Sequence, residues 1–349
     1  MKVIHIESGL GNQMLSYCEY LALKKLNPND TCYIETIVFD IPECNDTICQ
    51  WNGYELDRVF GIDAPNIKSL FTEQQWERII SDVRSSEFWN KEWNWPVAIT
   101  NALNNAGLSL DNERGNFEVD SHFSNPSKYF LLKQRLKQSG LGTFVRRLYY
   151  GVTEKKRLTM CDNRSNIWKK TDRSILTGQW LSFKLRGNDI NLLKDDIDKA
   201  FRFPPFSDER SADFAHFLDS CNAVFIHARR GDMLTANGWC YKHGYFRRAV
   251  KYIKRYVEDP VFVFFTNPGS VEWCKDNART FGLDYSRDKV LFVDWNAGED
   301  SFRDMQLMSH CKHGIITNST FGWWGAYFIT NPNKITISPE IYINTTHHC

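Results

Sequence analysis

The chain has 349 residues, of which 42% are hydrophobic and 24% charged, a composition that excludes an intrinsically disordered protein. Its 43 Lys and Arg residues nearly balance its 42 Asp and Glu residues, and the formal net charge of +1 argues against a general binder of nucleic acid or of anionic membranes. Any anion site must therefore be local, and the length predicts about two domains.

The first strand is predicted at residues 3–6, followed by a turn at Gly9-Leu10-Gly11, a helix over residues 12–26 and a strand over residues 32–35. A strand, a glycine turn and a helix N-terminus form a shape that suits anions, because free N–H groups point at the loop. The alternative is a plain strand–helix turn. The candidate ligand-binding residues of this stretch are Gly9, Gly11, Asn12 and Gln13.

This N-terminus has no apolar run of signal-peptide length, since Glu7 interrupts it, and no window reaches the roughly 18 apolar residues of a spanning helix. We therefore expect a cytoplasmic protein. The 10 cysteines form no CxxC pair and no zinc-finger spacing, so we expect mostly reduced, buried thiols.

Residues 65–205 mix amphipathic helices with polar loops, and Pro204-Pro205 is the best candidate for a domain boundary. We expect an N-terminal domain over residues 1–205 with a helical insertion, and a C-terminal domain over residues 206–349. Trp89, Trp93 and Trp95 offer aromatic surfaces on which a sugar could stack, although local packing is the simpler interpretation.

The C-terminal region alternates strands and helices, which predicts a parallel sheet whose ligands bind at the carboxyl ends of the strands. Strands are expected at residues 222–226, 261–265, 290–293, 314–317 and 334–337. Helices are expected at residues 245–257, 270–281, 301–311 and 319–329.

The stretch HARRGD (His227 to Asp232) directly follows the first of these strands. The guanidinium groups of Arg229 and Arg230 stay charged and form paired hydrogen bonds with phosphate oxygens. The alternative is a solvated loop with an incidental arginine pair. Asp232 could orient a guanidinium or accept a proton.

A second anion cradle is predicted at NSTFGWWGA (residues 318–326), where Ser319 is a natural N-cap and the Ser319 and Thr320 hydroxyls join free N–H groups. Trp323 and Trp324 are expected to pack this helix on the sheet. Asp304 lies on the preceding helix, near the same edge.

Asp196-Ile197-Asp198 matches the DxD pattern that holds a divalent cation in many sugar transferases. It lies in the run KDDIDKA, which is helical in pattern, and we interpret it as a solvated charged face. No metal site is predicted from this sequence.

Together, SGLGNQM, HARRGD and DMQLMSHC…NSTFGWWGA resemble, in order and spacing, the bacterial α-1,2-fucosyltransferases of glycosyltransferase family 11. The resemblance implies an α/β fold of the GT-B type, with two Rossmann-like domains facing across a cleft. It implies inverting transfer of L-fucose from GDP-β-L-fucose to the 2-hydroxyl of a terminal β-galactoside. GDP-fucose is then a co-substrate, and no cofactor is expected.

The resemblance also implies roles for single residues. His227, Arg229, Arg230 and Asp232 stand at the family's HxRRxD positions, with Arg229 on the β-phosphate, Asp304 on the guanine, and Ser319 and Thr320 on the diphosphate. Two departures stand out: the family often has an acidic pair after the strand ending FF, where this chain has Phe265-Thr266-Asn267-Pro268-Gly269, and Gly322 replaces a frequent serine.

The catalytic base is open among Asp232, which we favour, His227, Glu7 and His5. We expect a surface-glycan enzyme acting on a galactose-terminated oligosaccharide. A lipid-linked acceptor would bring it to the inner face of the cytoplasmic membrane. The alternatives are a fucosyltransferase of different linkage and a non-catalytic protein that binds GDP-sugars or glycans.

Overall fold

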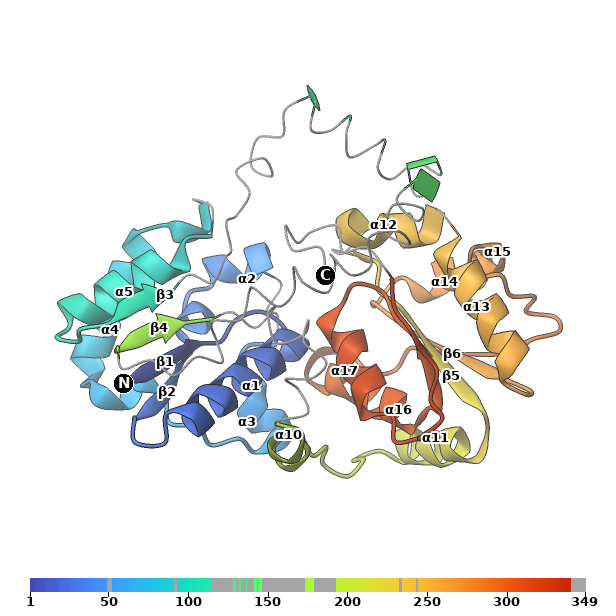
Figure 1. The fold of residues 1–349 in the computed structure, drawn as a ribbon, viewed down its shortest axis with the longest axis horizontal. Helices are drawn as coiled ribbons and strands as arrows, with labels where there is room; N and C mark the ends of the chain where they lie inside the picture. The colour runs from blue at the N-terminus through green and yellow to red at the C-terminus, as the bar shows by residue number, and fades with distance from the viewer. Residues whose placement is uncertain are drawn as a thin grey trace. The chain divides into compact units, whose positions relative to one another are not determined.

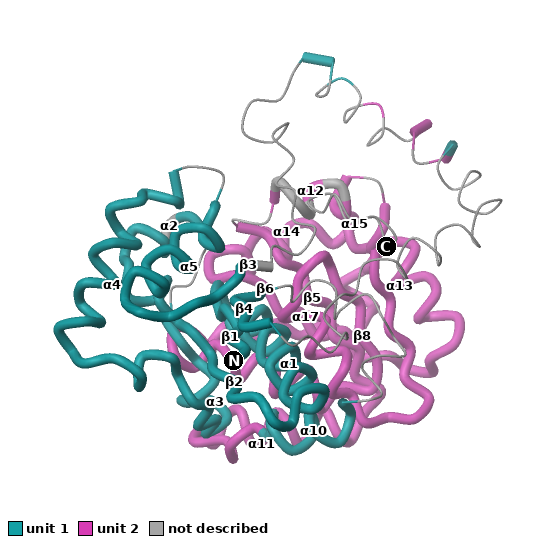
Figure 2. Tube along the Cα trace, turned by 60° about the vertical axis from the view of Figure 1, so that its left-hand side comes forward, with its two compact units in different colours: residues 1–135, 145–202, 349 teal, residues 136–144, 203–348 magenta. Residues whose placement is uncertain are grey.

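The computed structural model describes residues 1–48, 52–90, 93–113, 173–178, 193–231, 234–242 and 244–339, with a few positions between 128 and 145 (Figure 1). The chain divides into two compact units (Figure 2). Unit 1 comprises Met1–Arg135 and Val145–Arg202, and unit 2 comprises Leu136–Phe144 and Phe203–His348. The main division, between Arg202 and Phe203, lies beside the Pro204-Pro205 pair singled out in the sequence.

Unit 1 contains a four-stranded parallel sheet with the strand order β2-β1-β4-β3. The strands are β1 (Lys2–His5), β2 (Cys32–Glu35), β3 (Asp111–Glu113) and β4 (Ile175–Thr177). The chain passes from β1 to β2 on one side and later returns to place β4 on the other. The order therefore reverses between β1 and β4, which is the position where ligands bind in open α/β sheets.

The helices of unit 1 begin where local chemistry favours them. Thr72 and Gln75 form a capping box at the start of α4, and Pro96 stands in the first turn of α5, where its missing N–H costs nothing. The helices and 3₁₀ turns are α1 (Leu10–Leu26), η1 (Ile37–Asp40), α2 (Glu43–Ile48), α3 (Leu56–Phe60), η2 (Ile67–Leu70), α4 (Glu73–Ser85), η3 (Phe88–Asn90), α5 (Trp95–Asn105) and α10 (Lys194–Ala200).

The predicted turn at Gly9-Leu10-Gly11 was wrong in one respect. Helix α1 begins at Leu10 with Gly9 as its N-cap, so Leu10 and Gly11 belong to the first helical turn. The backbone N–H of Gln13 already donates to the Gly9 carbonyl, which starts the helix two residues earlier than predicted.

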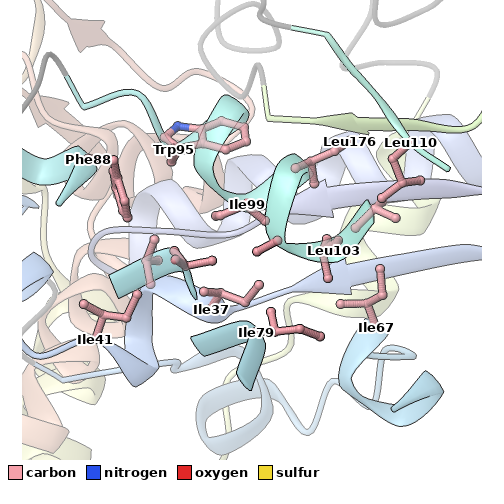
Figure 3. Close-up of a cluster of buried hydrophobic side chains, with 14 of the residues drawn as sticks. Ile37, Ile41, Ile67, Ile79, Phe88, Trp95, Ile99, Leu103, Leu110 and Leu176 are labelled. Carbon is pink, nitrogen blue, oxygen red and sulfur yellow. The ribbon is translucent and has the colours of Figure 1, made fainter. Parts of the chain in front are cut away.

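One hydrophobic core of unit 1 lies between the sheet and helices α4 and α5 (Figure 3). Val3 and Leu176, from neighbouring strands, meet Ile79 of α4 and Ile99 and Leu103 of α5, and all five are at most 1% exposed. This core fixes the face of β1 to which Val3 belongs, and His5, two residues on, shares that face.

Unit 2 contains a five-stranded parallel sheet with the order β7-β6-β5-β8-β9. Its strands are β5 (Ala223–Ala228), β6 (Val261–Thr266), β7 (Lys289–Val293), β8 (His313–Ile315) and β9 (Thr336–Ile337). All five lie at the predicted places. The order reverses between β5 and β8.

Helices cover both faces of this sheet, as the alternation of side chains along β5 requires. Val224 and Ile226 belong to one core, and Phe225 belongs to the other. The helices are α11 (Glu209–Ser220), α12 (Leu234–Lys242), α13 (Tyr245–Tyr256), α14 (Val271–Asp276), α15 (Ala278–Phe281), η5 (Gly298–Ser301), α16 (Phe302–His310) and α17 (Thr320–Phe328). Trp324 is fully buried, as predicted, and Met305 and Met308 of α16 are fully buried too.

The single helix predicted for residues 270–281 is two helices, α14 and α15, separated at Asn277. The Asn277 side chain donates to the carbonyl of Trp273 at 2.7 Å, so it competes with the backbone ladder and interrupts the helix.

The α/β class with parallel sheets is confirmed, and the GT-B arrangement of two facing domains stays a prediction. The seven cysteines in the described part of the chain are free thiols, and six of them are buried. In the same part of the chain, no helix has both the length and the apolar character needed to cross a membrane.

Candidate active site

The HARRGD stretch lies at the carboxyl end of β5, the central strand of unit 2. His227 is the penultimate residue of β5, and Arg229 and Arg230 follow the strand directly. Strands β6 and β8 flank β5, and the strand order reverses between β5 and β8. This is the position at which doubly wound sheets bind nucleotides.

The backbone of the two arginines is held by side chains from three neighbouring positions. The Thr266 hydroxyl donates to the Ala228 carbonyl at 2.8 Å, and the Tyr241 hydroxyl donates to the Arg229 carbonyl at 2.9 Å. The Arg230 N–H donates to the Asn267 side-chain oxygen at 2.7 Å. These three hydrogen bonds hold the backbone on which the two arginine side chains are mounted.

Thr266 and Asn267 belong to the stretch 265–269, in which the resembling family often has an acidic pair. The sequence showed this departure, but we did not predict from it that the two side chains hold the backbone of the arginine pair. The signal was available: both residues stand at the end of the strand next to β5, and such ends meet at one edge of a parallel sheet.

The Arg230 guanidinium stacks on aromatic rings. Its Cζ lies 3.4 Å from the ring centre of Trp273 on α14 and 5.1 Å from that of Tyr241 on α12. This cation–π contact holds the planar group by its face. Trp273 and Tyr241 were not predicted, because residues brought together from two separate helices leave no mark in the local sequence.

His227 is 4% exposed, and its Nδ1 atom has no hydrogen-bond partner. Burial and the nearby charge of Arg229 lower the pKa of His227 to about 3. The imidazole is therefore neutral at physiological pH, which makes it a weak proton acceptor in the free protein and removes one of the base candidates.

The second departure from the resembling family, Gly322 in place of a frequent serine, has a steric reason. A Cβ atom built on Gly322 would lie 2.9 Å from His227 Cγ and closer still to Nδ1. Side chains do not approach an imidazole so closely, so α17 reaches β5 only because this residue is glycine.

We expect Gly322→Ala to lower the free energy of unfolding of unit 2 by about 1–3 kcal/mol, because it overpacks a filled site. Chemical denaturation measures the change. The matched control is Gly238→Ala on α12, where a Cβ would meet no atom within 4 Å. Adding His227→Ala to the Gly322 variant should recover most of the loss. A Gly322→Ala protein as stable as the unchanged one would contradict this account.

Ser319 is the N-cap of α17, as predicted, but its side chain makes no capping hydrogen bond. The Ser319 and Thr320 side chains thus lie at the N-terminus of α17, and the Ser319 hydroxyl does not cap this helix. First-turn N–H groups and the helix dipole favour an anion there. Thr317, two residues after β8, donates to the His227 carbonyl at 3.4 Å, which ties this segment to β5.

Asp304 lies in the first turn of α16, as predicted, and accepts a hydrogen bond from Asn296 at 2.8 Å. Burial raises the pKa of Asp304 to about 7, against the opposing effect of the Asn296 hydrogen bond. A desolvated carboxyl of this kind suits a ligand that presents N–H donors, because such donors stabilise its charged form.

The four candidates in SGLGNQM belong to unit 1. Gln13 donates to the carbonyls of Ser8 and Gly53, both at 2.8 Å, and accepts from the N–H of Glu55 at 2.8 Å. The Gln13 side chain therefore connects the backbone at Ser8 to the backbone at Gly53 and Glu55. Asn12 donates to the Ser8 hydroxyl at 2.9 Å, while Gly9 and Gly11 lie in the start of α1. Their binding of a donor stays a prediction.

Two other sequence predictions need separate mention. Asp232 lies outside the described residues. Asp196 and Asp198 are on α10, as the solvated-face interpretation expects, and each has a lysine partner: Lys25 lies 2.9 Å from Asp196, and Lys194 pairs with Asp198.

Unit 2 is a doubly wound α/β domain, with the arginine pair at the carboxyl end of its central strand. Comparison with known proteins shows which protein family this domain resembles. The family model of Glycosyl transferase family 11 matches residues 210–348, which confirms for this part of the chain the resemblance predicted from the motifs.

Two of the relatives are each similar to about a third of the chain. An alpha-1,2-colitosyltransferase of Escherichia coli is 37% identical over 125 residues, which are 34% of this chain and 40% of the relative. A galactoside alpha-(1,2)-fucosyltransferase 1 of Plecturocebus brunneus is 34% identical over 109 residues, or 30% and 28% of the two chains. The matched regions thus span less than half of each relative.

A solved structure of NodZ alpha-1,6-fucosyltransferase co-crystallised with GDP is also similar. It has 11% sequence identity and a TM-score of 0.44, and the alignment covers 93% of this chain and 90% of that one.

Proposed function

We propose that this protein transfers L-fucose from GDP-β-L-fucose to the 2-hydroxyl of a terminal β-galactoside, with inversion at the sugar carbon. The observation that carries the proposal is the arginine pair at the carboxyl end of β5, with its backbone held by Thr266, Asn267 and Tyr241. The family match over residues 210–348 and the α-1,2 linkage in the names of both relatives support it.

The chemistry of the donor fits these groups. When the bond between the fucose carbon and the phosphate oxygen breaks, the electron pair goes to the β-phosphate of GDP, which gains negative charge. Arg229, Arg230 and the first-turn N–H groups of α17 would stabilise that charge, and a preorganised donor of this kind contributes about 2.7–4 kcal/mol. Asp304 would accept N–H groups of the guanine.

The sugar left behind resembles an oxocarbenium ion. The acceptor oxygen attacks from the face opposite the phosphate, so the β-linked donor gives an α-linked product. A general base removes the hydroxyl proton as this bond forms. We propose that guanidinium and N–H groups, without a metal ion, balance the charge of the diphosphate.

The test is to mix the purified protein with GDP-fucose and lactose in EDTA and to determine the product linkage by NMR. We expect a 2-fucosylated galactoside. Binding of GDP without turnover over a panel of β-galactosides would favour a non-catalytic binding protein. A product linked elsewhere would identify a different transferase. Activity lost in EDTA and restored by Mn²⁺ would return Asp196 and Asp198 to consideration.

The two relatives differ in the sugar that their names contain, fucose in one and colitose in the other. This observation favours nucleotide-activated colitose as a second candidate donor. Parallel assays with both donors at equal concentration decide between them, and we expect the higher kcat/KM with fucose.

A further inference from the structure

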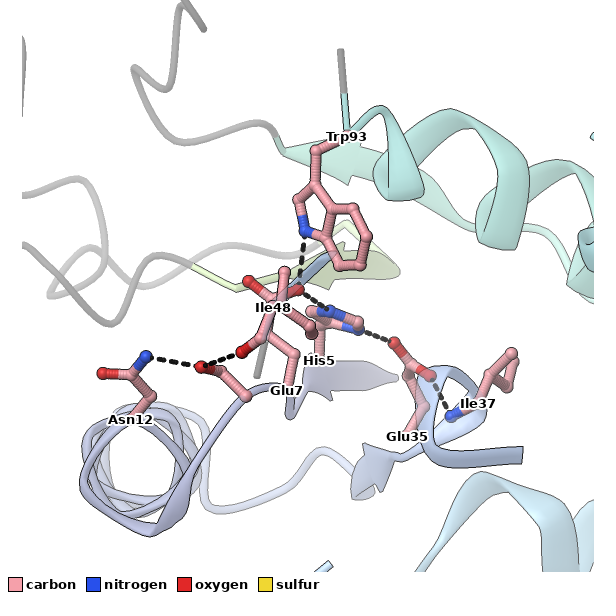
Figure 4. Close-up of polar contacts among 8 residues, drawn as sticks. His5, Glu7, Asn12, Glu35, Ile37, Ile48 and Trp93 are labelled. Atoms are coloured by element: carbon pink, nitrogen blue, oxygen red, sulfur yellow. Dashed lines mark hydrogen bonds and ion pairs between the residues drawn. The ribbon is translucent and has the colours of Figure 1, made fainter. Parts of the chain in front are cut away.

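Unit 1 contains a chain of ionisable groups at the carboxyl end of β1 (Figure 4). The His5 ring contacts two carboxylates: Nδ1 bonds Glu35 of β2, and Nε2 lies 3.0 Å from Glu7. Glu35 also accepts the backbone N–H of Ile37 at 2.9 Å, and Glu7 accepts the indole N–H of Trp93 at 2.8 Å. Trp95 stacks on the His5 ring, with 3.8 Å between ring centres.

These contacts fix the charge of the histidine. Burial alone would lower the pKa of His5, but the charges and hydrogen bonds of Glu35 and Glu7 outweigh it and raise the pKa to about 9. His5 is therefore an imidazolium at neutral pH, donating from both nitrogens. The Cys44 thiol of α2 also lies in the field of Glu7, and burial raises its pKa to about 12, so it is neutral.

Folding alone gives little reason to keep this arrangement. His5, Glu35 and Glu7 bring three ionisable side chains together in a largely buried place, and well-packed apolar residues of similar volume are often as stabilising as such buried groups. Buried titratable groups held by specific partners are characteristic of functional sites.

The position in the sheet leads to the same conclusion. His5 ends β1, Glu7 follows it, and the strand order of unit 1 reverses between β1 and β4. Gly178, directly after β4, lies so close that a Cβ there would be 3.0 Å from both His5 and Trp95. The group thus occupies the ligand-binding position of an open α/β sheet.

The residue that follows Glu7 in the chain and the residue whose indole bonds Glu7 both have strained backbones. Ser8 has a φ of 68° and Trp93 a φ of 52°, values that residues other than glycine rarely adopt. Each such residue costs on the order of 1–3 kcal/mol, and such strain concentrates at active sites. Here it places the Glu7 carboxylate and the Trp93 indole against each other.

Among the three ionisable side chains, Glu7 is the most exposed. Its side chain is 11% exposed, against 1% for His5 and 0% for Glu35. A ligand can therefore reach the chain of groups through Glu7. His5 is already protonated and His227 is a weak base, so Glu7 is the best proton acceptor among the described base candidates.

We propose that Glu7 is the general base that removes the proton from the acceptor hydroxyl, an inference that rests on the proposed function. The O–H bond breaks, its electron pair forms the bond to the fucose carbon, and the proton moves to the carboxylate and then to water. GDP leaves with the electron pair of the old bond. His5, Glu35 and Trp93 are positioning residues that hold the carboxylate in place.

The test compares Glu7→Gln with the unchanged protein, using two acceptors. With a galactoside, kcat should fall about 10²–10⁴-fold, the usual contribution of a general base. With azide, which carries no proton to remove, transfer of fucose should continue within a few-fold of the unchanged rate. Equal losses with both acceptors, or a galactoside rate near normal, would overturn the proposal.

The controls separate this inference from the proposed function. Glu77→Gln, the same change at an exposed position of α4, should leave both rates unchanged. If the unchanged protein makes no fucoside at all, the proposed function fails. If it does, and Asp232→Asn abolishes galactoside transfer while Glu7→Gln does not, the base is Asp232 and only this inference fails.

Trp93→Phe tests positioning, because it keeps a ring and removes the N–H that stabilises the Glu7 carboxylate. We expect kcat with a galactoside to fall, while transfer of fucose to azide and the affinity for GDP stay unchanged. A merely structural tryptophan would lower stability and affect both acceptors equally, and this outcome would remove Trp93 from the proposal.

Discussion

Arg229→Ala is expected to slow fucose transfer by about 10²–10³-fold, because it removes one preorganised donor from the charge that develops on GDP. The effect should fall mainly on kcat, since the charge is larger when the bond to the sugar is breaking than in the bound donor. Arg229→Lys should recover only part of the rate, because an ammonium group lacks the planar fork. Steady-state kinetics with GDP-fucose and lactose measures both variants.

The control for this prediction is Arg287→Ala. The Arg287 side chain is 86% exposed, and the residue precedes β7, at the amino end of the strands of unit 2. It should change neither the rate nor the thermal unfolding. A rate near normal in Arg229→Ala, in a protein that unfolds like the unchanged one, would remove Arg229 from the site and leave Arg230, stacked on Trp273, as the phosphate ligand.

The second prediction concerns stability and pH in unit 1. The pKa of His5 is raised from 6.5 to about 9 on folding, so its protonation stabilises the folded state fully below pH 6.5. That contribution is lost as the pH rises through about 9. We expect the free energy of unfolding to fall by about 2–3 kcal/mol between pH 6.5 and 9, as measured by chemical denaturation with tryptophan fluorescence.

Glu35→Gln should flatten this pH dependence and, at pH 7, cost about 3–5 kcal/mol, because it removes one partner of a buried ion pair. Asp219→Asn is the matched control: it removes the carboxylate of the exposed His310–Asp219 pair, whose nitrogen and oxygen lie 3.1 Å apart. The control should keep the full pH dependence. A Glu35→Gln protein with an unchanged slope would show that His5 is not the titrating group.

Much of unit 2 could be predicted from the sequence. Apolar runs such as 261–265 and the helical pattern of 245–257 gave the parallel sheet, because a strand buried on both faces must be apolar throughout. The same reasoning was less effective at element ends. The helix predicted for 270–281 divides at Asn277, and α1 begins at Leu10, since both ends depend on single hydrogen bonds.

For the aromatic stretch of unit 1, the sequence left two interpretations open, and the tertiary structure decided between them. Trp89, Trp93 and Trp95 were considered as a stacking surface for a sugar, with local packing as the alternative. Trp95 is 7% exposed and stacks on His5, while Trp89 packs on Phe88, so packing is the better description of both. Trp93 donates to Glu7, a contact 86 residues apart in the chain.

By itself the sequence determined the five strands of unit 2 in order, the place of the arginine pair at a strand end, and the resemblance to glycosyltransferase family 11. All of these are encoded in residues close together in the chain. Only the tertiary structure decided that Trp273 stacks on Arg230, that Gly322 makes room for His227, and that His5 joins Glu7 to Glu35. Such contacts come from packing between distant segments, and local sequence carries no record of which distant side chains will meet.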